Sequence, residues 1–270
     1  MSRARTGAYA LWQLRDYLKD RAVPTLIVGT LSGYLGFEAV VKELPLPRAG
    51  AWVSPGLIAQ FGSADAVHAI RMAQFNYAFL SSILGAIVFV GALFAMNGIV
   101  ANDRKMGFYR FLFAKPVTPS RYYGQAFLLH WAGFMAAMTV LALMYGVAIW
   151  PLLTQELLVV LALMFLPYAG IAFLLSAAAR WDWLSLVAAS IVSTLLWQRF
   201  GESSHPLANL LYVLPPLHRA NEVFASIPGG PGSAAPVATP WSLLAWLAGY
   251  GALCYLAGLV VLRYRRLAIV

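Results

Sequence analysis

The side chains that could carry out acid–base chemistry are few in this sequence and lie far apart. His130 stands inside a long apolar run, Glu38 lies near the end of another, and Glu156 lies near the start of a third. An ionisable residue within a membrane segment is a functional candidate, because burying it there is costly. A lone histidine near a helix end is more often a hydrogen-bonded packing residue, and carboxylates near helix ends reach the interface. We therefore interpret all three as structural.

Motifs for nucleotide, metal or acyl chemistry are absent from the sequence. It contains no G-x-x-x-x-G-K-[ST] phosphate loop, no H-E-x-x-H and no G-x-S-x-G. Cys254 is the single cysteine, which excludes an internal disulfide and a cysteine-based zinc site. No series of charged residues crosses the apolar runs, which counts against a proton-coupled pump. We expect no catalytic residue, no bound metal and no cofactor on this chain.

One polar stretch stands out, "NDRKMGFYRFLFAKPVTPSRYYG", from Asn102 to Gly124. Basic and aromatic side chains alternate in it, and an apolar run lies on each side. The pattern predicts a short amphipathic helix over about 103–114, a break at Lys115–Pro116, and a new helix capped by Thr118 and Pro119. A helix this short is marginal in water, so a partner or lipid headgroups must stabilise it.

The composition is that of a membrane protein. Hydrophobic residues make up 61% of the chain and charged residues 11%, whereas soluble domains have about 45–50% and about 25%. The net charge of +9 could suggest nucleic acid. However, the basic residues cluster beside apolar runs, where they act as topology signals and headgroup contacts. We expect membrane lipids, and no nucleic acid, as partners.

Six segments are long and apolar enough to predict an all-α polytopic protein with six transmembrane helices. They cover residues 22–41, 75–97, 122–149, 155–179, 183–197 and 240–262. We expect residues 1–21 to form a cytoplasmic amphipathic interface helix, and residues 22–270 to form a single transmembrane domain. Pro167 should kink the fourth span.

The distribution of Lys and Arg predicts the orientation. Fourteen of the 19 lie at the termini, in the 98–121 loop and at Arg180, and five lie on the opposite side. This asymmetry places both termini and the polar stretch in the cytoplasm. We expect a multi-pass protein of the cytoplasmic (inner) membrane.

Two regions outside the spans have a helical pattern. Leu11, Leu14 and Leu18 recur at helical spacing, which indicates a helix lying on the cytoplasmic leaflet; the alternative is a cytosolic helix packed on its own protein. The 200–239 loop contains an apolar half that proline interrupts, which favours re-entrant or interfacial helices between spans five and six. Ser63 is placed to cap a helix that continues into the second span.

Small and flexible apolar residues are candidates for helix contacts and a substrate path. Gly29, Gly33 and Gly36 allow another helix to approach the first span, either in a dimer or internally. Methionine and aromatic residues in spans two to four mostly pack or face lipid, and some could line an apolar path. These are Phe79, Phe89, Phe94, Met96, Phe134, Met135 and Met138.

The polar stretch has a more specific pattern than a basic anchor needs. From Arg104 to Arg121 it reads R–x–x–G–F–x–R–F–L–x–A–x–P–V–x–x–S–R. This resembles the cytoplasmic loop of ABC-2 type transporter permeases. That family has an amphipathic N-terminal helix, a coupling helix between spans two and three, re-entrant helices between spans five and six, and cytoplasmic termini. Each feature has a counterpart here, so the resemblance covers nearly the whole chain.

The resemblance implies a permease that binds a separate cytosolic ABC ATPase and a second permease chain, as a homodimer or with a sister subunit. ATP and magnesium would bind to the ATPase. The implied coupling contact consists of Arg104, Lys105, Gly107, Phe108, Arg110, Phe111, Leu112, Lys115 and Pro116. Phe108, Phe111 and Leu112 would be its buried anchors.

Two functions remain open at this point. The first is an exporter permease without catalysis of its own, which moves a hydrophobic or amphipathic substrate such as a lipid, drug or lipid-linked glycan. The second is a membrane scaffold or accessory subunit that recruits a cytosolic partner through the basic loop. A lipid-modifying enzyme is disfavoured, since no two acid–base candidates share one depth. No substrate-binding residue can be assigned from the sequence.

Overall fold

The protein is described by a computed structural model. The described residues are 11–12, 14–15, 17–43, 52–96, 99–100, 103, 118–148, 151–178, 182–201, 211, 214, 217–227 and 239–264. Every regular element in this part of the chain is helical, which confirms the all-α prediction.

Three helices are long and apolar enough to cross a membrane: α8 (Pro119–Ala148), α9 (Gln155–Ala178) and α12 (Trp241–Tyr264). They coincide with the third, fourth and sixth predicted spans. Helices also occupy the other three predicted spans: α2 (Val23–Glu43), the series α4 (Ala64–Phe79), η2 (Leu80–Leu84) and α5 (Gly85–Met96), and α10 (Asp182–Phe200). Six crossings and cytoplasmic termini remain predictions.

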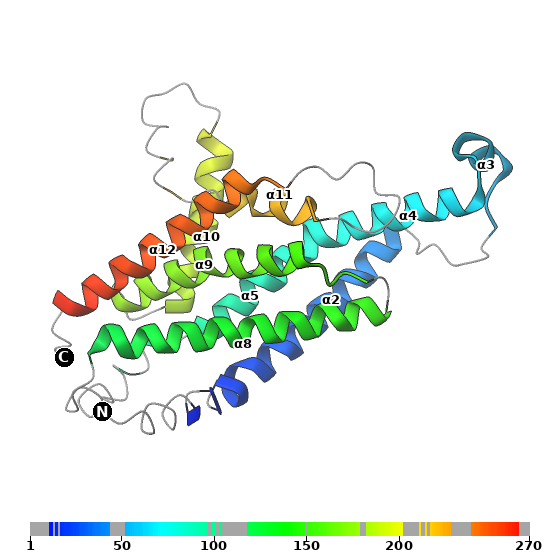
Figure 1. The fold of residues 1–270 in the computed structure, drawn as a ribbon. Helices are drawn as coiled ribbons and strands as arrows, with labels where there is room; N and C mark the ends of the chain where they lie inside the picture. The colour runs from blue at the N-terminus through cyan, green and yellow to red at the C-terminus, as the bar shows by residue number, and fades with distance from the viewer. Residues whose placement is uncertain are drawn as a thin grey trace.

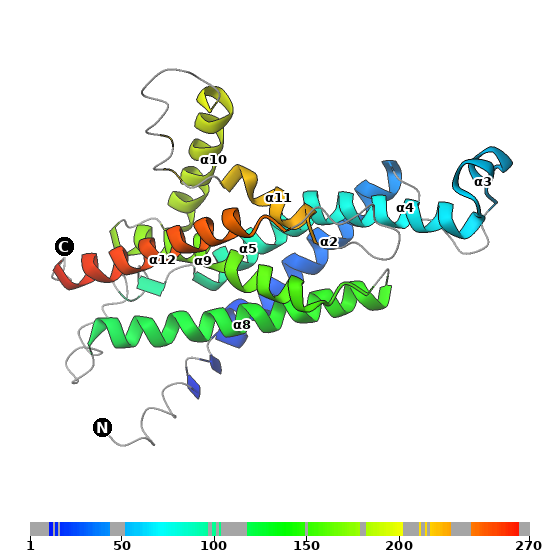
Figure 2. The same ribbon diagram turned by 45° about the horizontal axis from the view of Figure 1, so that its top comes forward.

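The helices form an elongated bundle with α9 in its interior (Figure 1). α12 lies along α9, and α5 and α8 also contact α9. The start of α8 and the end of α12 lie at the same end of the bundle, on the left in Figure 1. α10 contacts α9 but projects away from the bundle in both views (Figure 2).

Side-chain caps define where several helices begin. The Ser63 hydroxyl accepts a hydrogen bond from the Ala66 N–H at 3.1 Å, and α4 continues through η2 into α5. The Thr118 hydroxyl accepts from the Arg121 N–H at 3.4 Å, with Pro119 as the first residue of α8. Both predicted caps are confirmed, since each satisfies an N–H that the first helical turn leaves without an intrahelical partner.

Glycine brings α9 and α12 into backbone contact. A Cβ on Gly170 would meet the Gly251 carbonyl oxygen, and a Cβ on Gly251 would meet backbone atoms of Leu166 and Pro167. Farther along, a Cβ on Gly258 would lie 2.6 Å from the Phe173 ring. The order of these contacts shows that α9 and α12 run parallel, packed as closely as small residues permit.

Short helices lie between α10 and α12, as the sequence predicts for this loop. η4 (Leu217–Arg219) leads into α11 (Ala220–Ala225), which contacts η2 and α5. Val223 and Phe224 are fully buried. On the exposed side of these helices, Arg219 forms two 2.8 Å hydrogen bonds with Glu222. These hydrogen bonds raise the pKa of the Arg219 guanidinium. The position of these helices relative to a bilayer remains a prediction.

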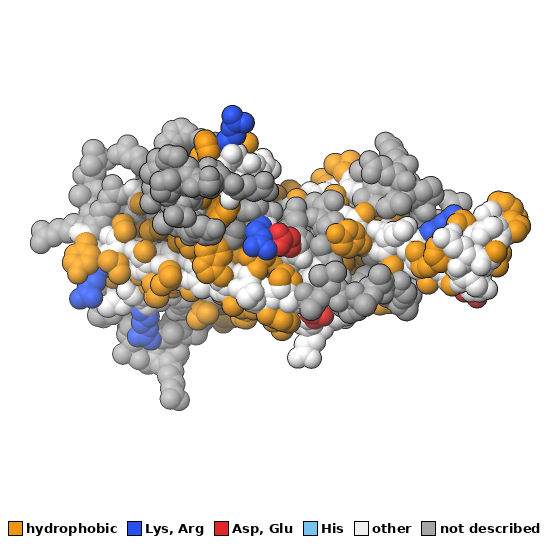
Figure 3. Space-filling view, turned by 90° about the horizontal axis from the view of Figure 1, so that it is seen from above, with side chains coloured by type: hydrophobic (Ala, Val, Ile, Leu, Met, Phe, Trp, Pro, Cys, Tyr) orange, Lys and Arg blue, Asp and Glu red, His pale blue; other side chains and the backbone are white. Residues whose placement is uncertain are grey.

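The described surface is rich in apolar side chains. Figure 3 shows a face on which hydrophobic side chains are widespread and charged ones are few. Leu31, Leu128 and Leu253 are all more than half exposed. Large exposed apolar areas are unusual for a soluble monomer and indicate contact with lipid or another apolar partner.

Candidate functional site

A pocket of about 320 Å³ opens between α2 and α8. This volume falls at the lower end of the about 300–1,000 Å³ typical of small-molecule sites. Its lining comes from α2, from the junction of α4, η2 and α5, from the second half of α8, and from α9 with the residues before it. The lining residues are Gly29, Thr30, Gly33, Tyr34, Phe79, Leu84, Ile87, Met138, Leu141, Ala142, Met144, Tyr145, Ala148, Leu152, Leu157 and Leu161.

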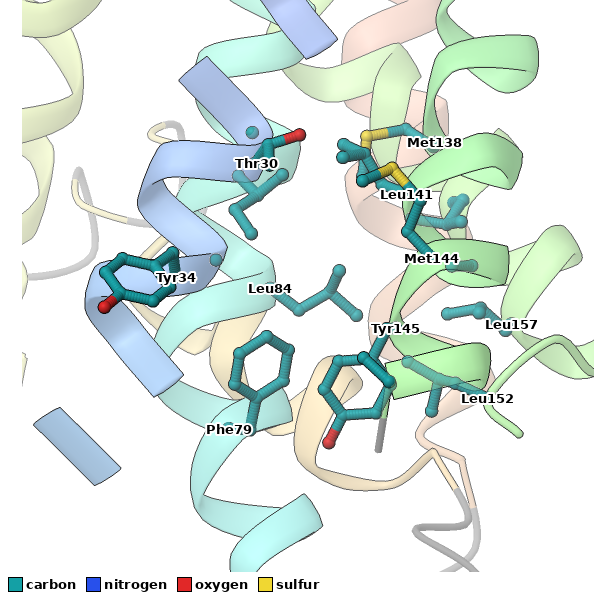
Figure 4. A pocket seen from close by; sticks show the side chains of 16 residues that line it. Thr30, Tyr34, Phe79, Leu84, Met138, Leu141, Met144, Tyr145, Leu152 and Leu157 are labelled. Carbon is teal, nitrogen blue, oxygen red and sulfur yellow. The ribbon is translucent and has the colours of Figure 1, made fainter. Parts of the chain in front are cut away.

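The pocket has a closed floor and an open side. Leu152, Leu157 and Leu161 are nearly inaccessible and form part of the floor. Phe79 and Tyr145 close one end, with their ring centroids 4.7 Å apart (Figure 4). On the open side, Tyr34 of α2 is 59% exposed and Met144 of α8 is 49% exposed. The entrance therefore lies on the flank of the bundle, between two helices.

The wall chemistry is almost wholly apolar. Thr30, Tyr34 and Tyr145 contribute the only side-chain oxygens in the lining. The Tyr34 hydroxyl donates a 3.0 Å hydrogen bond to Glu38 one turn along α2, so a carboxylate is bonded to a residue of the lining. The two lining methionines are flexible and polarisable, which suits a ligand of irregular shape.

The glycines predicted to allow close helix contact, Gly29, Gly33 and Gly36, face the protein's own helices along this pocket. A Cβ on Gly29 would lie 2.5 Å from a Leu141 methyl, and one on Gly36 would lie 2.6 Å from the Ile83 side chain. A Cβ on Gly33 would have only the tip of Ile87 within reach, at 4.0 Å. Gly33 therefore leaves space that belongs to the pocket.

The sequence suggested Phe79 and Met138 as possible path residues, and both line the pocket. The other members of that group do not. Leu152 and the start of α9 were missed, because nothing in the sequence indicates that the short link after α8 returns to cover the pocket floor.

The basic stretch connects directly to α8. The predicted coupling residues lie outside the described residues: Arg104, Lys105, Gly107, Phe108, Arg110, Phe111, Leu112, Lys115 and Pro116. The residues that flank them are described. Asp103 accepts a 3.2 Å hydrogen bond from the Tyr123 hydroxyl in the first turns of α8, and Thr118 caps that same helix. Tyr123 is 1% exposed and packs against Phe173 of α9.

His130 is a packing residue in the described structure. Its Nδ1 lies 2.6 Å from the Ala126 carbonyl oxygen. A carbonyl only accepts hydrogen bonds, so Nδ1 carries a proton. The ring also contacts the Tyr17 ring edge to face, with centroids 5.0 Å apart.

Tyr17 was not singled out by the sequence, yet it is almost completely buried. A Cβ on Gly133 of α8 would meet the Tyr17 ring, so this glycine provides the space that the ring occupies. Leu11, Trp12 and Leu18 of the same N-terminal segment are more than half exposed. Tyr17 thus packs against α8, while Leu11, Trp12 and Leu18 are largely exposed.

Glu156 forms a different polar contact, at the other end of the bundle. Its Oε1 accepts a hydrogen bond from the Thr239 hydroxyl, which joins the start of α9 to the start of α12. Among the described residues, no three His, Cys, Asp or Glu side chains gather where they could hold a metal ion.

Comparisons of the chain with protein-family models, with characterised proteins and with solved structures give no match.

Proposed function

We propose that this chain is the membrane-spanning permease subunit of an ATP-driven ABC-2 type exporter. In this proposal it has six spans and cytoplasmic termini, lies in the cytoplasmic membrane, and pairs with a second permease chain. A separate cytosolic subunit binds ATP and magnesium and hydrolyses the ATP. The cargo is hydrophobic or amphipathic, in keeping with the apolar walls of the pocket.

The attachment of the basic stretch to α8 carries the proposal. The resemblance lies in the stretch from Arg104 to Arg121. The described residues that flank its undescribed part both contact α8, since Asp103 accepts a hydrogen bond from Tyr123 and Thr118 caps the helix. A force applied to this stretch by an ATPase would therefore act on α8.

α8 extends from this attachment to the pocket. It contains 30 residues, which corresponds to about 45 Å at 1.5 Å per residue. Its second half supplies Met138, Leu141 and Tyr145 to the pocket wall. A rigid-body shift of such a helix would change the pocket at one end in response to the loop at the other.

The test is reconstitution with a cytosolic ABC ATPase that co-purifies with this chain. Changing both Phe108 and Phe111 to Ala should release the ATPase, because the double variant removes two central aromatic anchors, and hot-spot truncations cost about 2 kcal/mol or more each. Phe113→Ala is the matched control, since a helix places Phe113 on the opposite face from Phe108 and Phe111. Co-purification and ATP hydrolysis are the measurements. An intact complex with unchanged hydrolysis in the double variant would contradict the coupling role.

A second variant separates coupling from attachment. Tyr123→Phe removes the hydroxyl that bonds Asp103 but keeps the buried ring. We expect the ATPase to remain bound while ATP-driven flux in proteoliposomes falls. A complex that assembles but moves no amphiphile in the wild-type form would favour the scaffold function instead.

A further inference from the structure

We propose that the pocket between α2 and α8 binds the hydrocarbon chain of a membrane amphiphile whose headgroup is uncharged or cationic and lies beside Tyr34 and Glu38. The binding itself does not depend on ATP-driven export. As the cargo of an exporter, however, this ligand rests on the proposed function.

The occupant follows first from where the pocket opens. Its floor is closed by buried leucines, and its entrance lies between exposed residues of α2 and α8, which belong to an apolar flank. Water has few polar partners inside such a pocket and does not fill it favourably. A hydrocarbon chain can enter sideways from a bilayer without leaving an apolar environment.

The shape of the pocket favours one chain rather than a bulky ring system. The volume of about 320 Å³ is small, and the aromatic pair of Phe79 and Tyr145 blocks one end. Since lipid tails are as apolar as the walls, binding depends on close packing rather than on the hydrophobic effect. The side chains of Met138 and Met144 can adjust to supply this packing.

The charge near the entrance determines which kind of headgroup can bind. Glu38 is exposed, and its Oε1 accepts the hydrogen bond from Tyr34, which is one of the residues that line the pocket. Glu38 is thus a charged side chain that is hydrogen-bonded to a residue of the lining. A carboxylate there attracts a cationic head, accepts hydrogen bonds from a hydroxyl-rich one, and repels an anionic one.

Photolabelling of the purified full-length chain in neutral-lipid nanodiscs tests this inference, without any ATPase. Three probes share one alkyl chain with a terminal diazirine and differ in their heads, which are trimethylammonium, glucoside and sulfate. Adducts are located by mass spectrometry. We expect the trimethylammonium and glucoside probes to label the pocket side of α8 and the 152–161 region. The sulfate probe should label them less.

A matched pair of glycine variants separates the pocket from general lipid contact. Gly33→Leu places a side chain in the pocket, because only Ile87 lies within 4.0 Å of its Cβ. Gly249→Leu makes the same change on the exposed side of α12, where a Cβ meets nothing within 4 Å. We expect Gly33→Leu to lose the pocket adducts and Gly249→Leu to keep them. Thr30→Phe, which narrows the entrance, is the second variant if Gly33→Leu does not fold.

Glu38→Gln tests the headgroup. It should abolish the preference for trimethylammonium over sulfate while the glucoside probe continues to label. Equal labelling of wild type and Gly33→Leu, a crosslink to a second copy in place of a probe adduct, or equal labelling by sulfate and trimethylammonium would each overturn the inference. Failure of ATP-driven export with pocket labelling intact would contradict the proposed function alone.

Discussion

The pair α9–α12 and the pair α2–α8 both carry glycines along their contact, but the atoms that face those glycines differ. In α9–α12, Gly170 and Gly251 face backbone atoms of the opposite helix. In α2–α8, Gly29 faces the end of a leucine side chain, and a Cβ on Gly33 would have only the tip of the Ile87 side chain within reach, at 4.0 Å. One contact is therefore fixed by the main chain, while the other can adjust by side-chain rotation.

Because of this difference, we expect the α9–α12 contact to be rigid and the α2–α8 contact to be adjustable. Backbone atoms cannot move without moving a helix, so α9 and α12 should shift together, and Glu156 and Thr239 join their first residues. Side-chain ends adopt other rotamers at small energetic cost. The pocket, to which we assign a ligand in our proposal, lies on the adjustable pair.

Gly251→Ala is the strongest test of the fixed contact. The added methyl meets backbone atoms of Leu166 and Pro167, so the helices must separate, and we expect a loss of about 3 kcal/mol or more in stability, at the upper end of the cost of overpacking. The midpoint of thermal unfolding in detergent measures it. Gly249→Ala, two residues away and without neighbours, should be neutral or stabilising by up to about 1 kcal/mol. Equal losses in both variants would remove the distinction between the two contacts.

Gly133→Ala tests a glycine that faces an aromatic side chain. The methyl group would collide with the Tyr17 ring, which is buried and cannot easily rotate away. We expect a loss of about 1–3 kcal/mol from overpacking. The loss should largely disappear in a Tyr17→Ala background, because neighbouring changes are not additive. An undiminished loss in the double variant would mean that Gly133 matters for another reason.

Gly29→Ala should have the smallest effect, because the atom that the methyl group meets first is a terminal methyl of the Leu141 side chain, at 2.5 Å. Rotation of the Leu141 side chain relieves the contact, and the greater helix propensity of alanine offsets part of what remains. We expect a loss below about 1 kcal/mol, under the usual range for overpacking, measured by the same unfolding midpoint. A loss as large as that of Gly251→Ala would show that α2 is held as rigidly as α12.

Much of the helical framework could be predicted from the sequence, because apolar runs and caps are local signals. Thr118 and Ser63 each precede their helix by a fixed number of residues, and both cap it in the structure. The buried Tyr17 could not be predicted in this way. Its environment depends on Gly133, which is more than a hundred residues away and is one of many small residues in the apolar runs.

The candidate site shows the same limit. Gly29, Gly33 and Gly36 could be recognised as contact residues from their spacing. The sequence alone left open whether they face a second chain or this one, since that depends on how α2 crosses α8. Leu152 and Leu157 cover the pocket floor only because the chain turns back after α8, and no local pattern encodes where a turn brings the next helix.

The length of α8 has a consequence for its depth in a bilayer. The helix measures about 45 Å, whereas the hydrocarbon core is about 30 Å thick. For α8 to cross a membrane, the helix must tilt or its ends must extend into the headgroup layer. Its first turns contain Arg121, Tyr122 and Tyr123, residue types that favour the membrane–water boundary. The carboxylate of Asp103 would then meet Tyr123 at that boundary, where water can solvate its charge. A change in bilayer thickness would change the depth of the Asp103–Tyr123 hydrogen bond relative to the headgroup layer. Membrane thickness would then act on the basic stretch that follows Asp103.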